Sequence, residues 1–145
     1  MVTVKDLLEI KGNQVWTIPP DSPVRSALEK MAEKNVGALV VVANDAVVGI
    51  FSERDYAIGA VEEQNFSLDM SVARFMSSPV YAVSQNETVD GCIALMTQKR
   101  FRHLPVIEDG KLIGLISIGD LVKQDLLEME KKIRDLEDYI WIHMI

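Results

Sequence analysis

A seven-residue segment that occurs twice constrains the fold of this chain more than any other feature of its sequence. Residues 49–55 are Gly-Ile-Phe-Ser-Glu-Arg-Asp, and residues 114–120, which lie 65 positions later, are Gly-Leu-Ile-Ser-Ile-Gly-Asp. The same spacing, without a gap, aligns further apolar residues: Val15 with Val80, Val24 with Val89, Met31 with Met96, Leu39 with Leu104, and Val41 with Val106. A repeat of this regularity predicts one supersecondary unit that is used twice.

Each copy has the pattern strand, helix, strand, strand, helix. The first helix is expected to begin with Ser22 as its N-cap and Pro23 at the first helical position. Continuous runs of Val and other apolar residues are typical of buried strands, and Asp109-Gly110 is a hairpin signal between two of them. The expected strands lie at 15–18, 38–43 and 47–51 in the first copy and at 80–83, 103–108 and 111–117 in the second, and the helices at 22–34, 52–61, 88–99 and from 117 onward.

Packing the two copies sheet to sheet buries the sheet face that one copy alone leaves bare. We therefore expect an α/β fold of the α+β type with pseudo-two-fold symmetry, in which the two Ser-x-x-Asp turns lie in clefts between the copies. The expected organisation is a lead-in helix and first domain over 1–61, a polar linker over 62–70, a second domain over 71–127, and a C-terminal helical tail over 128–145.

The bulk composition excludes several classes of function. A net charge of −7 and a pI near 4.8 argue against nucleic acid and against an anionic membrane as partners. The chain has no secretory signal, and its single cysteine, Cys92, cannot form an internal disulfide, so we expect a cytoplasmic protein. It contains no catalytic constellation and no set of residues with metal-ligand spacing, and we expect neither an enzyme nor a metal site.

The segments 35–42 with 48–55, and 102–107 with 112–120, resemble the paired cystathionine β-synthase-type (CBS) domains called Bateman modules, over about residues 12–61 and 77–127. The resemblance implies a non-catalytic regulatory module, such as an energy sensor, that binds an adenosine-containing nucleotide between its two motifs. AMP, ADP or ATP is the favoured ligand, and NAD or S-adenosylmethionine is an alternative. A second alternative is a structural adaptor or dimerisation module with vestigial clefts.

Asp55 and Asp120 are the candidate ribose ligands, because a carboxylate at the start of a helix can accept hydrogen bonds from vicinal hydroxyls. The alternative is that each Ser-x-x-Asp segment is a capping box. Ser52 and Ser117 have the same two interpretations. Each either caps its own helix or offers a hydroxyl to a phosphate at the helix N-terminus.

Cations distinguish the two copies. The resemblance implies that Arg102 and His103 face the nucleotide phosphates, with Gly119 and Arg54 at the helix starts. The first copy has Gly37 and Ala38 at the positions of Arg102 and His103, so we expect the site of Asp120 to be richer in cations. For Arg100 the sequence leaves two roles open, a phosphate ligand and a solvated surface charge. For His103 the alternative to a phosphate ligand is a half-buried strand residue.

The base is expected to lie between apolar walls. The resemblance implies that one wall lies opposite Asp120 and is formed by Val15, Trp16, Val36 and Gly37, and that the other lies opposite Asp55 and is formed by Val80, Tyr81, Phe101 and Arg102. Trp16 and Tyr81 occupy equivalent positions. An aromatic ring there either stacks on adenine or takes part in ordinary strand packing, and the sequence leaves both open.

Apolar surfaces outside the clefts predict a homodimer. The tail carries apolar residues at steps of three and four, as in a coiled-coil seam: Leu126, Met129, Ile133, Leu136 and Ile140. We expect the tail and the rim helices to form the contact, the rim helices through Val24, Ala27, Leu28, Val89 and Ile93. The competing arrangement folds the tail back onto its own body. The sequence does not identify a downstream protein partner.

Overall fold

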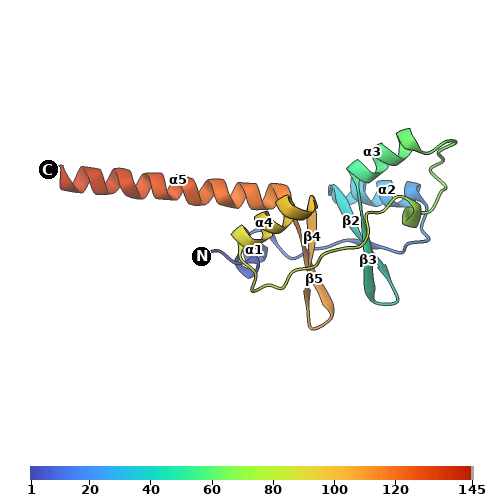
Figure 1. Ribbon diagram of the computed structural model, residues 1–145, viewed down its shortest axis with the longest axis horizontal. Helices are drawn as coiled ribbons and strands as arrows, with labels where there is room; N and C mark the ends of the chain where they lie inside the picture. Colours follow the sequence, from blue (N-terminus) through green and yellow to red (C-terminus); the bar gives the residue numbers. More distant parts are fainter. Residues whose placement is uncertain (145) are drawn as a thin grey trace.

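The computed structural model describes residues 1–144 and shows two similar halves, with one long helix projecting from the second half (Figure 1). The first half contains β1 (Thr17–Ile18), α2 (Val24–Lys34), β2 (Ala38–Ala43), β3 (Ala46–Ser52) and α3 (Glu53–Glu62). The second contains α4 (Val89–Lys99), β4 (His103–Glu108), β5 (Lys111–Ser117) and the start of α5 (Ile118–His143). The expected repeat is confirmed, except that the expected strand at 80–83 is reduced to a single bridge between Val83 and Val106.

The two sheets have matching registers. β2 and β3 are antiparallel, with β1 parallel to β2 on the other side, and β4 and β5 form an antiparallel pair. Asp109 and Gly110 have φ angles of +50° and +77°, as a tight hairpin requires, and this confirms the predicted turn. Ala38 pairs with Ser52, and at the equivalent position His103 pairs with Ser117, so each Ser turn lies beside the start of its neighbouring strand.

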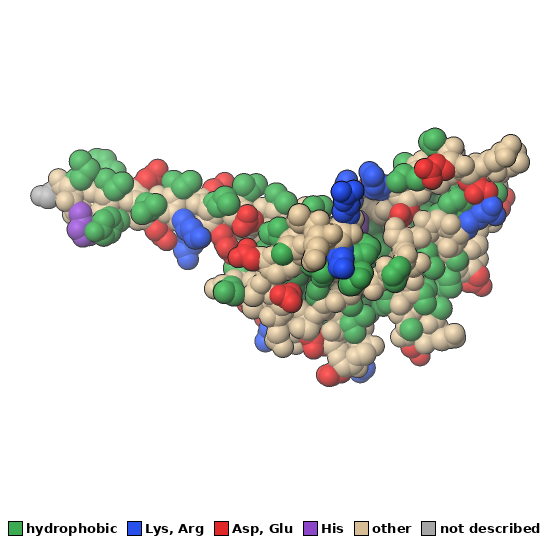
Figure 2. All heavy atoms as spheres, viewed as in Figure 1, with side chains coloured by type: hydrophobic (Ala, Val, Ile, Leu, Met, Phe, Trp, Pro, Cys, Tyr) green, Lys and Arg blue, Asp and Glu red, His purple; other side chains and the backbone are tan. Residues whose placement is uncertain are grey.

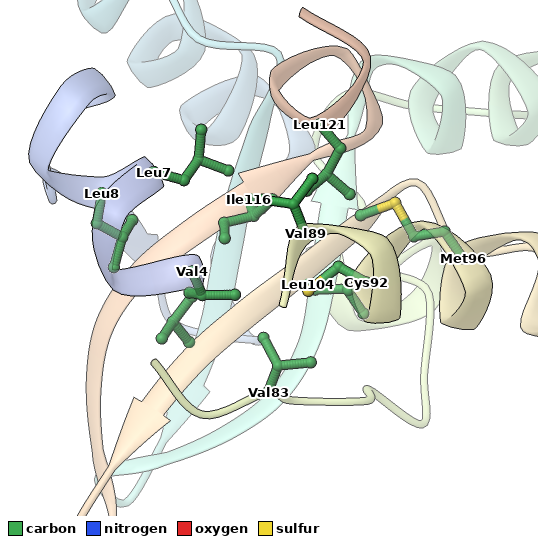
Figure 3. Close-up of a cluster of buried hydrophobic side chains, with 11 residues drawn as sticks. Val4, Leu7, Leu8, Val83, Val89, Cys92, Met96, Leu104, Ile116 and Leu121 are labelled. Carbon is green, nitrogen blue, oxygen red and sulfur yellow. The ribbon is translucent and has the colours of Figure 1, made fainter. Parts of the chain in front are cut away.

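The lead-in segments are exchanged between the halves. Helix α1 (Val4–Lys11) precedes the first half, yet its apolar face packs in the core of the second half (Figure 3). The short 3-10 helix η1 (Val72–Arg74) precedes the second half, yet Val72 packs in the core of the first. Domain boundaries that follow the order of the chain do not describe this exchange of lead-in segments. Because each core needs a segment from the other side of the linker, the two halves form one interdependent unit.

Two local predictions are wrong. Pro23, not Ser22, is the N-cap of α2, and no side chain caps that helix. The apolar residues expected on exposed rim faces lie instead in the two cores: Val24, Ala27 and Val89 are buried, and Leu28 and Ile93 pack against the same cores. An amphipathic helix turns its apolar stripe toward the nearest sheet, so most of this stripe is covered, while Leu28 and Ile93 remain partly exposed.

The tail does not fold back onto the body. Leu121 and Gln124, near the start of α5, are buried, and beyond them the helix leaves the body (Figure 1). The five seam residues are each between 50% and 62% exposed: Leu126, Met129, Ile133, Leu136 and Ile140. Hydrophobic side chains lie along the whole length of this projecting helix (Figure 2).

Candidate functional site

Each Ser-x-x-Asp turn forms a complete capping box. The amide of Asp55 donates to Ser52 Oγ at 3.2 Å, and Asp55 Oδ2 accepts from the Ser52 amide at 2.9 Å. In the second copy, the corresponding distances between Ser117 and Asp120 are 3.1 Å and 2.9 Å. The capping interpretation of both turns is therefore confirmed. A ligand role would be additional to it, and at Asp55 a ligand would replace the Ser77 hydroxyl, which donates to the second oxygen, Oδ1, at 2.8 Å.

At the start of each of these two helices, one backbone amide remains free to donate a hydrogen bond to an external anion. The amide of Glu53 donates to the Gly37 carbonyl at 3.0 Å, and the equivalent amide of Ile118 donates to the Arg102 carbonyl at 2.9 Å. With the third amide of each helix held by its Ser, the amides of Arg54 and Gly119 have no acceptor among residues 1–144. A helix N-terminus with a free amide attracts negative charge such as phosphate.

The Asp55 cleft, as we call the cavity beside this acid, has a volume of about 220 Å³ and is built from both halves. The second half contributes the segment that connects α4 to β4, and the first contributes the start of α3. Its lining residues are Ile50, Ser52, Arg54, Asp55, Ile58, Ser77, Pro79, Val80, Tyr81, Arg100, Phe101, Arg102 and His103. It therefore brings together an acid, an apolar wall, three arginines and a histidine.

The Asp120 cleft is smaller, at about 170 Å³, and its basic side chains are Lys11 and His103. Its other lining residues are Gln14, Val15, Trp16, Val36, Gly37, Ala38, Leu115, Ser117 and Asp120. The prediction that the site of Asp120 is richer in cations is thus wrong. Arg100 and Arg102 belong to the second copy in sequence, but each cleft joins the acid of one copy to the strand entrance of the other.

His103 lies between the two sites. It lines both clefts and also a third hollow, which is formed between the two helix starts by Gly37, Ser52, Glu53, Arg54, Arg102, Ser117 and Ile118. Burial lowers the pKa of His103 below its usual value of 6.5, although the negative charges of Asp55 and Asp120 oppose this shift. The imidazole is therefore neutral at pH 7, and a phosphate placed beside it favours its protonated form.

Sequence analysis did not find Lys11, although it makes the shortest hydrogen bond to either acid. Its Nζ donates to Asp120 Oδ2 at 2.6 Å and to the Leu115 carbonyl at 2.8 Å. Burial alone would raise the pKa of Asp120, but the hydrogen bonds from Lys11 and Ser117 and the Lys11 charge lower it below its usual value. Lys11 lies outside the repeat, in a lead-in segment that packs on the other copy, so no pattern in the sequence points to it.

The two aromatic residues at equivalent positions have different surroundings. Tyr81 packs on Phe101, with ring centroids 5.0 Å apart, and lies outside both hydrophobic cores with 40% of its surface exposed. Trp16 packs against the core of the first half and also lines the Asp120 cleft. The packing alternative therefore accounts for Trp16, whereas Tyr81 contributes to the wall of a cleft.

Basic side chains gather around the notch between the two halves, despite the acidic charge of the whole chain (Figure 2). Within residues 1–144, no group of three or more His, Cys, Asp or Glu side chains is arranged to hold a metal ion. None of the helices in that range combines the length and the apolar character needed to cross a bilayer.

Comparisons with known proteins agree on one family. The family model described as CBS domain matches residues 4–58 and 72–126. A curated relative, the mitochondrial CBS domain-containing protein CBSX3 of Arabidopsis thaliana, is 34% identical over 95% of this chain and 71% of its own length. The solved structure of a CBS domain, NE2398, is 46% identical with a TM-score of 0.81, and the match covers 87% of this chain and 99% of that one.

A further solved structure has a ligand. The CBS domain protein PAE2072 from Pyrobaculum aerophilum was solved in complex with AMP. It is 26% identical to this chain with a TM-score of 0.75, and the match covers 90% of this chain and 99% of that one.

Proposed function

This chain belongs to the CBS-domain family, and we propose that it is a non-catalytic regulatory module that binds an adenine nucleotide in the Asp55 cleft. One observation carries the proposal: a single cleft between the two halves contains a carboxylate, an aromatic wall and four basic side chains. Binding of AMP by a structural relative, PAE2072, supports the same ligand class.

The proposed binding mode assigns one part of the ligand to each part of the cleft. The ribose hydroxyls donate to Asp55, and the base lies against Val80, Tyr81 and Phe101. The phosphates point toward the free amide of Arg54 and the side chains of Arg102 and His103. Ser52 offers its hydroxyl at the same helix start, and Arg100 adds positive charge at the cleft.

Phosphorylated ligands are favoured over other adenosine compounds by charge. Three arginines favour the negative phosphates of AMP, ADP or ATP, and disfavour the positive sulfonium of S-adenosylmethionine. A thermal-shift panel of AMP, ADP, ATP, NAD and S-adenosylmethionine tests the proposal. A ligand at 100 times its dissociation constant stabilises the fold by about 2.7 kcal/mol, which corresponds to roughly 5–11 °C in melting temperature for a domain of this size. No shift with any of the five would reject nucleotide binding and favour the adaptor.

Assembly forms the second part of the proposal. With most of the expected rim faces covered by the cores, the projecting part of α5 carries most of the large exposed apolar side chains among residues 1–144, and the occupant that we assign to it is the tail of a second copy. The five seam residues are spaced for knobs-into-holes packing, and charged residues occupy the positions between them. A two-fold axis allows the same stripe to meet itself, so one seam serves both chains.

A further inference from the structure

The two acids, equivalent in the repeat, differ in what they already bind. Asp120 accepts a hydrogen bond from the ammonium group of Lys11 at 2.6 Å, and these side chains are 25% and 31% exposed respectively. The Lys11 bond is on Oδ2, the oxygen that also caps the helix, whereas Asp55 accepts its extra hydrogen bond on the other oxygen, Oδ1, from the neutral hydroxyl of Ser77 at 2.8 Å. A bond between two charged groups is about twice as strong as one with a neutral donor. A hydroxyl also releases its acceptor by rotating one torsion.

Lys11 is held in place by the fold. It is the last residue of α1, and that helix is anchored in the core of the second half by Val4, Leu7 and Leu8. The ammonium group also donates to the Leu115 carbonyl at 2.8 Å, so it binds two acceptors at the edge of the Asp120 cleft. Among residues 1–144 the first half has no equivalent of this contact, because η1 ends at Arg74, which pairs with Glu63 and does not line the Asp55 cleft.

We propose that Lys11 is an internal occupant of the Asp120 cleft and restricts nucleotide binding to the Asp55 cleft. A ribose diol binds a carboxylate by donating one hydrogen bond to each of its oxygens, and on Asp120 the charged ammonium group already occupies one of the two, Oδ2. The two clefts are thus unequal because of a residue outside the repeat. This inference rests on the proposed function for the Asp55 cleft, and it predicts one ligand per chain.

The lining of the Asp120 cleft determines which kind of ligand this cleft accepts when Lys11 is replaced. Its remaining charged group is Asp120, beside a neutral His103, so the cleft suits an uncharged nucleoside better than a phosphorylated one. Adenosine is therefore the probe. Lys11→Met keeps the apolar stem of the side chain and removes the ammonium group, and Lys5→Met makes the same charge change on α1 away from both clefts.

Isothermal titration calorimetry with adenosine tests the inference by stoichiometry. We expect one site per chain in the wild type and in Lys5→Met, two in Lys11→Met, and one again when Asp120→Asn is added to Lys11→Met. A second readout uses Trp16, which lines the Asp120 cleft and is the sole tryptophan once Trp141 is replaced by Phe. Its emission changes with adenosine in Lys11→Met and stays constant when Lys11 is intact.

The outcomes separate this inference from the proposed function. Two sites per chain in the wild type, or one site in Lys11→Met, would overturn the role of Lys11 while leaving the Asp55 cleft as a nucleotide site. A wild type that binds neither adenosine nor ADP, together with a Lys11→Met variant that binds one adenosine dependent on Asp120, would reject the proposed function and support the role of Lys11. Absence of both adenosine and ADP binding in both proteins would overturn both.

Discussion

Replacing each acid of the repeat by asparagine separates the two clefts. Asp55→Asn and Asp120→Asn make the same chemical change at the same helix position, and in both turns the carboxylate accepts the Ser amide at 2.9 Å. An amide oxygen still accepts this bond, so both helix caps persist and the two variants are matched controls for each other. We expect Asp55→Asn to weaken ADP binding strongly, and Asp120→Asn to leave it within about twofold of the wild type, a change well below 1 kcal/mol.

The magnitude follows from the hydrogen bonds at stake. Hydrogen bonds to a charged acceptor contribute roughly 1.5–3 kcal/mol, and every 1.4 kcal/mol or so corresponds to a factor of ten in the dissociation constant. The predicted loss for Asp55→Asn is therefore about 10- to 150-fold. Asp120→Asn removes a carboxylate that Lys11 already occupies, and its cleft lacks the arginines that attract phosphate.

Calorimetry of both variants with ADP measures the two dissociation constants, and a thermal melt without ligand checks that both remain folded. Equal losses, or a larger loss in Asp120→Asn, would refute the assignment of the nucleotide to the Asp55 cleft. A loss confined to Asp55→Asn, with unchanged melting temperatures, would separate ribose contact from helix capping.

Three further predictions concern pH, assembly and packing. Burial lowers the pKa of His103, and a bound phosphate favours its charged form, so ADP affinity should rise as pH falls below 6.5. In a calorimetric pH series, the His103→Gln variant should lack the rise that the wild type shows. Ile133→Lys, in the seam, should yield monomers in sedimentation experiments, whereas Asp138→Lys, off the seam, should not; a dimeric Ile133→Lys variant would exclude the tail contact. Gly49→Ala should lower stability by about 1–3 kcal/mol in a denaturant melt, because its Cβ would lie 2.5 Å from Met76 Sδ, and an unchanged melt would contradict this close packing.

Features set by local chemistry were predictable from the sequence. The hairpin at Asp109–Gly110 and the capping boxes at Ser52 and Ser117 depend on residues within a few positions of one another, and all are confirmed. The repeat also predicted correctly that clefts would lie between the copies, because two equivalent half-covered sheets must cover each other.

Features set by packing between distant segments were not predictable in the same way. Counting cations copy by copy grouped Arg102 with Asp120, since both belong to the second copy, although the family resemblance placed Arg102 opposite Asp55, and the structure has it in that cleft. Lys11 reaches Asp120 because α1 crosses to the other half. The apolar faces of α2 and α4 were visible in the sequence, but the same stripe fits a core or a partner equally well.

The most direct test of the central claim is a crystal structure of the protein with ADP at saturating concentration. The account predicts one ADP per chain in the Asp55 cleft, with its ribose on Asp55, its phosphates toward Arg54 and Arg102, and the contact between Lys11 and Asp120 intact. An ADP bound to Asp120 with the Asp55 cleft empty, or no ADP in either cleft, would contradict it.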